Sequence, residues 1–335
     1  MDGGTVPSGM VGTTPEVKMN RSAPSTETAW AYRAAGAAMC SGRISRIPIG
    51  LILSYCEGMT ITPDAPTETR SIDGVLLTPK EVKIYGQESL MPSANVAEER
   101  LRRKQKLAGA LRIFGRLGFG EGVAGHITVR DPEFPDHFWV NPLGLSFRHM
   151  RVSDLILVNH HGEVVYGEYA VNRAAYVLHA AVHTARPDVI AAAHAHSVYG
   201  KAFSSLGIKL DALTQDSCAF YENNVVISDH GGAVVFEEAA GRDFAEAFGQ
   251  YRAAIHQNHG HFTVGASVDE AVFWFVCFER CAQAQLAAMA AGTPKHIPHE
   301  SAVYTREQAG NAMTGWAHFQ PLWQEICRTD PELFD

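Results

Sequence analysis

The stretch Asn172–Gly200, NRAAYVLHAAVHTARPDVIAAAHAHSVYG, decides the fold that the sequence predicts. A helical pattern leads to a break at residues 186–188, and an apolar run over residues 189–193 follows it. This run predicts a strand that delivers His194 and His196. Because residues two apart on a strand point to the same face, both imidazoles are expected to face one point. Two convergent imidazoles are half of a first-row metal site.

A third histidine follows further along the chain. Residues 257–260, QNHG, predict the end of a strand and a tight turn, and His259 lies in that turn. His194, His196 and His259 would then supply three neutral nitrogen donors and leave a position for water or substrate. The alternative is that the His-x-His pair arose by chance, since the chain has 16 histidines.

Composition narrows the class of protein. With 335 residues, 46% hydrophobic and 19% charged, the chain can bury the core of one large or two modest domains. A net charge of -8 without a dense basic block argues against nucleic-acid or membrane partners, and no apolar run is long enough to span a bilayer. Six cysteines without CxxC spacing predict buried thiols and a cytoplasmic location. No Gly-rich phosphate loop is found, so nucleotide use is not expected.

The chain is expected to divide into three segments. Residues 1–95 show no sustained periodicity and predict an irregular, partly disordered extension. Residues 96–293 predict the metal-binding domain, and residues 294–335 predict a helical tail packed on the domain or on a neighbouring subunit.

Helices and strands alternate in the predicted domain without a regular βαβ repeat. This pattern favours an α/β or α+β domain with a mixed sheet covered by helices. The predicted strands cover residues 125–130, 138–142, 155–158, 164–166, 189–193, 225–227, 253–256 and 262–264. The predicted helices run from residue 98 to 118 or 120, and over residues 176–184, 197–207, 244–249 and 268–291, the last with Ser267 as its N-cap.

From about Glu98 to Gly292 the sequence resembles the class II aldolase/adducin superfamily. The matching pieces are residues 125–130 (GHITVR), 141–144 (NPLG), 153–155 (SDL), 179 (H), 186–188 (RPD), 194–197 (HAHS) and 258–260 (NHG). The resemblance implies a three-layer αβα fold with a central mixed, largely antiparallel sheet. It also implies a homo-oligomer, a tetramer by analogy, and a divalent metal ion on the three histidines, with Zn²⁺ as first choice and Fe²⁺ as second.

The sequence departs from the aldolases at the residue that matters most for their chemistry. Sugar-phosphate aldolases carry an acidic residue four positions before the one that matches His179, and this chain has Ala175 there. Alanine can neither bind a metal nor carry a proton. Arg173 stands where those enzymes have a small hydroxyl residue that binds phosphate, and His126 replaces a phosphate-binding Asn. The resemblance is therefore closer to the adducin-like branch, and cleavage of a phosphorylated sugar is not expected.

Other residues must then handle protons and substrate. His126 and Tyr221 are the candidate catalytic residues, and Tyr221 falls where the aldolases keep a catalytic tyrosine, although it is equally consistent with an ordinary loop position. Helical spacing places His179 and His183 on the face of Ala175, where either could take over part of the base role, although His179 is more consistent with a structural core histidine. The candidate substrate-binding residues are Asn141, Gly144, Arg173, His183 and Tyr199.

Three functions remain open at this point. The first is a metal-dependent, aldolase-like lyase that makes or breaks a C–C bond next to a metal-polarised oxygen of a non-phosphorylated small molecule. The second uses the same three histidines in a non-haem Fe(II) oxygenase or decarboxylase that acts on α-keto or α-hydroxy acids. The third is a non-catalytic, adducin-like interaction module.

Overall fold

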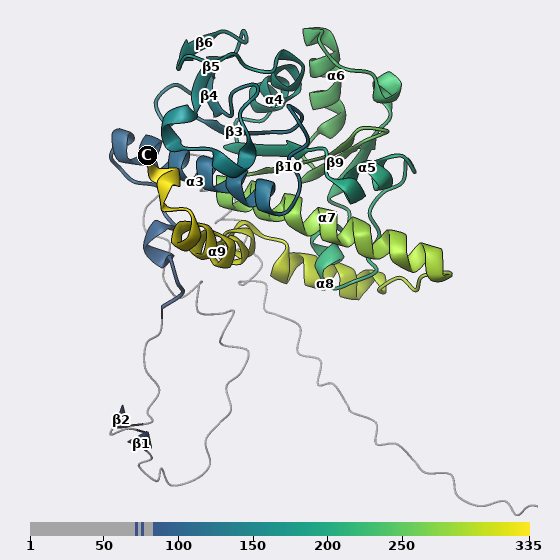
Figure 1. The fold of residues 1–335 in the computed structure, drawn as a ribbon. Coiled ribbons are helices and arrows are strands. Elements are labelled where there is room, and N and C mark those ends of the chain that lie inside the picture. The colour runs from purple at the N-terminus through teal and green to yellow at the C-terminus, as the bar shows by residue number, and fades with distance from the viewer. Residues whose placement is uncertain (1–70, 73–74, 77–82) are drawn as a thin grey trace, which may run out of the picture. The chain divides into compact units, whose positions relative to one another are not determined.

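The computed structural model describes residues 71–72, 75–76 and 83–335 (Figure 1). The extension predicted for residues 1–95 therefore lies mostly outside the described residues. Two short strands there, β1 (Ser71–Ile72) and β2 (Val75–Leu76), pair with each other in antiparallel register. The chain divides into one unit over residues 1–78 and a second over residues 79–335, and the second carries the site.

An eight-stranded sheet is the centre of the second unit (Figure 1). Its strand order is β6-β5-β4-β3-β7-β10-β9-β8, and every neighbouring pair is antiparallel except β8 and β9. The strands are β3 (His126–Arg130), β4 (His137–Val140), β5 (Ile156–Asn159), β6 (Val164–Tyr166), β7 (Ala191–Ala195), β8 (Asn224–Ile227), β9 (Ala253–His256) and β10 (Gly260–Gly265). The mixed, largely antiparallel sheet that the sequence predicts is confirmed.

Helices cover both faces of this sheet and give the three layers (Figure 1). On one face, α4 (Arg173–Ala185) and α6 (Glu238–Phe248) pack on each other and on β7 and β10. On the other, α3 (Val96–Arg116) and α7 (Val268–Ala291) enclose the largest core cluster, and α9 (Ala312–Thr329) packs outside them. Two further helices, α5 (Val198–Ser204) and α8 (His299–Ala309), complete the unit.

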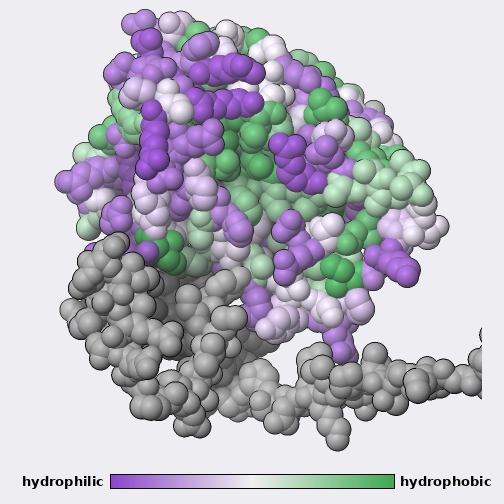
Figure 2. All heavy atoms as spheres, turned by 60° about the horizontal axis from the view of Figure 1, so that its bottom comes forward, coloured by the Kyte–Doolittle hydropathy of each residue, from purple (hydrophilic) through white to green (hydrophobic). Residues whose placement is uncertain are grey.

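Figure 2 turns the side of α7 and α9 forward and shows an apolar area bordered by hydrophilic side chains. Half-buried apolar residues of these two helices include Phe273, Val276, Leu322 and Trp323. In the part of the chain that the structure describes, no helix is long and apolar enough to cross a membrane.

Local hydrogen bonds explain the start of α7 and the start of β7, and the predicted bounds of β7 need correction. The side chain of Ser267 accepts from the backbone of Glu270 and caps α7, as the sequence predicts. The strand predicted over residues 189–193 lies instead at Ala191–Ala195, because the N–H of Val189 bonds back to Arg186 and prolongs the turn. Helix α6 (Glu238–Phe248) contains most of the residues predicted as part of a short helix, and α8 and α9 lie in the segment predicted as a helical tail.

Candidate metal centre

Strand β7 carries His194 to the middle of the sheet. The register places His194 opposite His126 of β3 and Phe262 of β10, so these side chains share one face. The ring of His194 stacks on Phe262 with 4.0 Å between centroids. Phe262 in turn contacts Phe244 of α6, which identifies this face as the one that α4 and α6 cover.

Three imidazoles meet at the end of β7. His196 follows the last residue of β7, and His259 lies in the turn between β9 and β10. Nε2 of His259 lies 3.1 Å from Nε2 of His194 and 3.1 Å from Nε2 of His196. Among the described residues, this is the one group of three or more His, Cys, Asp or Glu with ligand atoms within 4.8 Å of one another. The structure thus brings together the three residues predicted as metal ligands, here called the histidine cluster.

Hydrogen bonding and burial prepare these rings for metal binding. Nδ1 of His194 donates to the carbonyl oxygen of His261 at 2.9 Å, which leaves the lone pair on Nε2. Burial lowers the pKa of His194 well below its usual value, and burial also lowers the pKa of His196. Burial lowers the pKa of His259 to about 3. All three rings are therefore neutral near pH 7, the form that binds metal ions.

The spacing of the cluster fits a metal ion. A tetrahedral ion about 2.1 Å from each nitrogen places its ligand atoms about 3.4 Å apart, close to the observed separations. The ligand group contains no carboxylate and no thiolate. Three neutral imidazoles suit first-row ions such as Zn²⁺ and Fe²⁺ and leave positions for other ligands.

The turn at residues 257–260 aims His259 into the cluster. Asn258 has a left-handed backbone with φ of 59°, which Asn tolerates better than most residues, and its N–H donates to the carbonyl of Ser204. A Cβ on Gly260 would lie 3.3 Å from the ring of His194, so glycine allows this close approach. The motif predicted from the sequence therefore has a steric basis.

A buried carboxylate holds the segment that follows His196. Glu279 of α7 is 2% exposed and accepts from Oγ of Ser197 at 2.6 Å. It also accepts from the backbone N–H of Tyr199 at 2.9 Å and of Gly200 at 2.7 Å. The carboxylate thereby fixes the first turn of α5 and the direction in which His196 leaves β7. Sequence reasoning missed Glu279, whose only signal is an acidic residue within an apolar helix.

His126 lies beside the cluster with both ring nitrogens unused. It is 4% exposed, and neither nitrogen has a hydrogen-bond partner among the described residues. Burial lowers its pKa well below the usual value, and the neighbouring rings of His179, His196 and His259 lower it further. A buried polar group without a partner is costly, so His126 is placed to meet a ligand.

Asn141, the residue that follows β4, supports His126. Its side-chain oxygen accepts from the N–H of Ile127 at 3.3 Å, and its side-chain nitrogen donates to the carbonyl of Gly125 at 3.4 Å. Gly125 has a positive φ of 98°, and a Cβ there would lie 3.2 Å from Cα of Ala195. Asn141, predicted to bind substrate, thus engages the backbone on both sides of His126.

A second group of histidines lies beside His126, on the same face of the sheet. Oγ1 of Thr128 lies 2.8 Å from Nδ1 of His179 and 2.8 Å from Nε2 of His183, and Nδ1 of His183 lies 3.3 Å from the carbonyl oxygen of Val189. Burial lowers the pKa of both histidines to about 3. His183, predicted to bind substrate, has both nitrogens engaged, whereas Nε2 of His179 has no partner among the described residues.

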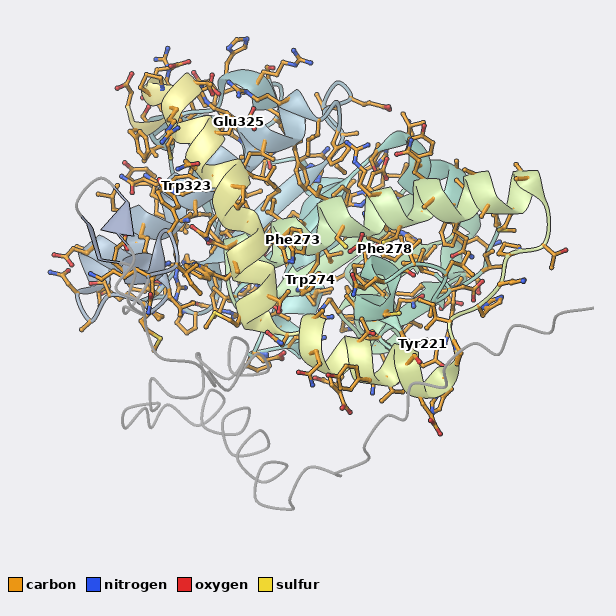
Figure 3. All side chains as sticks on the ribbon, turned by 90° about the horizontal axis from the view of Figure 1, so that it is seen from below. Tyr221, Phe273, Trp274, Phe278, Trp323 and Glu325 are labelled. Carbon is orange, nitrogen blue, oxygen red and sulfur yellow. The ribbon has the colours of Figure 1, made fainter. Side chains whose placement is uncertain are left out.

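Tyr221 lies on the other side of the sheet. Its hydroxyl lies 3.0 Å from Nδ1 of His299, and Figure 3 shows Tyr221 next to α8. The preceding Phe220 contacts Trp274 and Phe278, which belong to α7. Within this chain the structure does not bring Tyr221 to the cluster, and its catalytic role stays a prediction.

The remaining predicted substrate residues are dispersed. Arg173 is exposed at the first position of α4, and Tyr199 is half-buried in α5. The ion pair of Lys201 and Glu121 has 2.6 Å between Nζ and Oε2 and lies near His196. Lys201 lowers the pKa of His196, and Glu121 raises it. Gly144 borders a hollow of about 300 Å³ that is also lined by Gly115, Gly120, Gly122, Ser146, Phe147 and Arg148.

Comparisons with known proteins identify the family of this chain. Residues 105–286 match the family model of the Class II Aldolase and Adducin N-terminal domain. The chain is 44% identical over 239 residues to "Decarboxylase NovR" from Streptomyces niveus, which covers 71% of this chain and 88% of that protein. It is also 44% identical over 239 residues to "4-hydroxy-3-prenylphenylpyruvate oxygenase/4-hydroxy-3-prenylbenzoate synthase" from Streptomyces roseochromogenus subsp. oscitans, over 71% of this chain and 86% of that protein.

Among solved structures, the chain is similar to "L-fuculose 1-phosphate aldolase from Glaciozyma antarctica PI12". The TM-score is 0.68 with 45% sequence identity, over 73% of this chain and 96% of that one. The names of these relatives cover two kinds of chemistry on one fold, decarboxylation or oxygenation and aldol cleavage.

Proposed function

This chain belongs to the class II aldolase and adducin family, and on that premise we propose that it is a metal-dependent decarboxylase or oxygenase. Its substrate is a non-phosphorylated α-keto or α-hydroxy acid, and the enzyme breaks a C–C bond next to the oxygen-bearing carbon. Of the functions that the sequence leaves open, we thereby prefer the non-haem Fe(II) oxygenase or decarboxylase to the aldolase-like lyase.

One observation carries the proposal: the ligand group consists of three imidazoles and no carboxylate. The position where aldolases of the family keep their acid is Ala175 in α4. An all-imidazole site with open positions suits Fe²⁺ and oxygen, whereas Zn²⁺ has no redox chemistry. The names of the two relatives at 44% identity support the same preference.

The chain's own residues have distinct parts in this proposal. A bound metal ion would act as a Lewis acid for the substrate oxygen and, as Fe²⁺, as the redox partner of oxygen. His194, His196 and His259 hold the ion, and Glu279 fixes the direction of His196. His126 presents a neutral ring to the substrate beside them, because burial keeps it uncharged.

Aldol cleavage is the second candidate, since a structure with 45% identity is named as an aldolase. The enzyme would then use Zn²⁺ and need a proton carrier other than the residue at position 175. His126 is the group placed for that role, and Tyr221 could act there only from another subunit.

Oxygen uptake separates the two candidates. The purified protein is loaded anaerobically with Fe²⁺ or Zn²⁺ and mixed with 4-hydroxyphenylpyruvate in an oxygen electrode, and CO₂ release is followed in parallel. We expect oxygen uptake and CO₂ release with Fe²⁺ alone. Cleavage of L-fuculose 1-phosphate by the zinc protein, without oxygen uptake from the keto acid, would instead establish the aldolase.

The proposal includes a homo-oligomer, a tetramer by family resemblance, in the cytoplasm. Exposed Val165 and Tyr166 on the edge strand β6 support an association surface. Cys218, Cys277, Cys281 and Cys327 are free thiols, in keeping with a reducing compartment. Light scattering coupled to gel filtration tests the assembly, and a monomer at micromolar concentration would refute it.

A further inference from the structure

A line of hydrogen bonds runs through the buried space between β3 and α4. It starts at the carbonyl oxygen of Val189, continues through His183 and Thr128, and ends at His179. His183 and His179 lie four residues apart on α4, and both are at most 2% exposed. Sequence reasoning treated His179 as a structural core histidine, but one of its nitrogens remains without a partner among the described residues.

The donor and the acceptor of each hydrogen bond in this series can be assigned. A carbonyl oxygen only accepts, so Nδ1 of His183 carries the proton that Val189 receives. A neutral imidazole has one N–H, so Nε2 of His183 is an acceptor and the Thr128 hydroxyl must donate to it. The Thr128 hydroxyl has then used its only proton, and it accepts from Nδ1 of His179. Each assignment follows from the one before it.

The hydrogen-bonded series therefore ends at His179 with a nitrogen that carries a lone pair and no proton. With its proton on Nδ1, His179 has an unprotonated Nε2, which is buried and has no partner among the described residues. The ring of His179 lies 6.0 Å from the ring of His126, edge to face. His126 pairs in register with His194 of the cluster and lies two residues before Thr128, which contacts His179, so it lies between His179 and the cluster.

We infer that Nε2 of His179 accepts a hydrogen bond from a hydroxyl group of the substrate, and that Thr128 and His183 are positioning residues that keep this nitrogen unprotonated. A lone pair attracts O–H and repels the oxygen atoms of carboxylate or phosphate. The site would therefore select an α-hydroxy acid, or the enol form of an α-keto acid, over its ether. This assignment rests on the proposed function and names the chemical group of the substrate that His179 recognises.

Nuclear magnetic resonance reads the tautomer directly. In zinc-loaded protein labelled with ¹⁵N-histidine, the His179 signals are identified by their absence in His179→Phe. We expect Nδ1–H in the wild type and in Thr128→Ser, which keeps the hydroxyl, and a mixture of tautomers in Thr128→Val. A proton on Nε2 in the wild type would overturn the inference. A purely structural role for Thr128 would not change the tautomer.

Binding tests the hydroxyl itself. Calorimetry of the zinc-loaded protein compares mandelate, an aromatic α-hydroxy acid, with its O-methyl ether. We expect the wild type to prefer mandelate by about 3- to 10-fold, the range of one neutral hydrogen bond, and His179→Phe and Thr128→Val to lose most of this preference.

The same preference in all variants, or wild-type titrations that do not distinguish the two acids, including no heat from either, would overturn the inference. The zinc content of each variant must match the wild type, because His179 is not a ligand. Failure of the iron protein to consume oxygen would refute the proposed function and leave this binding ratio unchanged.

Discussion

Two histidine groups on one face of the sheet differ in how their ring nitrogens are used. In the cluster, Nε2 atoms of three histidines face one another at the end of β7. In the second group, which we call the Thr128 network, a hydroxyl and a carbonyl take up three of the four nitrogens of His179 and His183. Burial keeps the rings of both groups neutral.

This difference shows which property separates a metal-binding histidine from a structural histidine. Burial and a lowered pKa are common to both groups, so neither property identifies a metal ligand. The distinguishing feature is the partner of each nitrogen, because a structural ring has its lone pairs satisfied within the protein. His126 and Nε2 of His179 lie between these extremes, since they are buried without a partner among the described residues.

The largest effect is expected from His259→Ala. Loss of one of three ligands should weaken metal binding more than the roughly 10- to 100-fold typical of residues that only support a ligand, and turnover should fall with it. Mass spectrometry of bound metal and oxygen uptake measure this, with the exposed His160→Ala as the control. Wild-type metal content in His259→Ala would refute the cluster as the metal site.

The substitution Thr128→Val tests the Thr128 network. It keeps the shape of the side chain but leaves Nδ1 of His179 and Nε2 of His183 without a partner, at a cost of about 2–4 kcal/mol in the free energy of unfolding. Metal content should stay at the wild-type level. Urea unfolding measures the loss, and Thr128→Ser should recover most of it. Metal loss in Thr128→Val would show that the two groups are not independent.

Acid should weaken the fold through the Thr128 network. The pKa of His183 is about 3 in the folded protein against roughly 6.5 when unfolded, so its stabilisation is present above about 6.5 and is lost as pH falls toward 3. Between pH 7 and 5, one such group costs about 2 kcal/mol. His183→Phe should reduce the acid loss of the apoprotein by that amount, and the exposed His149→Phe should not. An unchanged pH dependence in His183→Phe would contradict the buried, neutral ring.

Glu279→Gln should have the smallest effect of the four. The amide nitrogen of Gln donates and cannot accept, so one of the two N–H groups of α5 loses its acceptor. His196 is then held less firmly, and metal affinity should fall by about 10-fold. Titration with a competing chelator measures the affinity. Glu325→Gln on the exposed side of α9 is the matched control (Figure 3). Equal affinities for both variants would leave Glu279 with a role in folding only.

Periodicity predicted most of the fold. The alternation in residues 125–130 and the capped apolar run of residues 268–291 are local signals, and both elements formed as predicted. The break at residues 186–188 was predicted, but the start of β7 was placed two residues too early, because the N–H of Val189 bonds to the carbonyl of Arg186 and prolongs the turn. Helix α8 lies in the predicted helical tail, but its ends were not predicted, because its apolar side packs on distant residues such as Cys218.

The candidate metal ligands were also predictable, because His194 and His196 share a strand face and His259 precedes a glycine in a tight turn. The partners of the other histidines were not. His179 and His183 lie on one face of the same helix and are both buried. Contacts with Thr128, some 50 residues earlier, engage two of their four ring nitrogens, the carbonyl of Val189 engages a third, and Nε2 of His179 has no partner among the described residues.

The sequence by itself determined the kind of protein, its sheet and helices, the three metal-ligand candidates and the absence of the aldolase acid at Ala175. These depend on residue identity and on spacing within one element. The tertiary structure alone decided the direction of each imidazole, the support of His196 by Glu279, and the separation of Tyr221 from the cluster. Hydrogen bonds between distant strands and helices set these features, and local sequence does not specify which donor meets which acceptor.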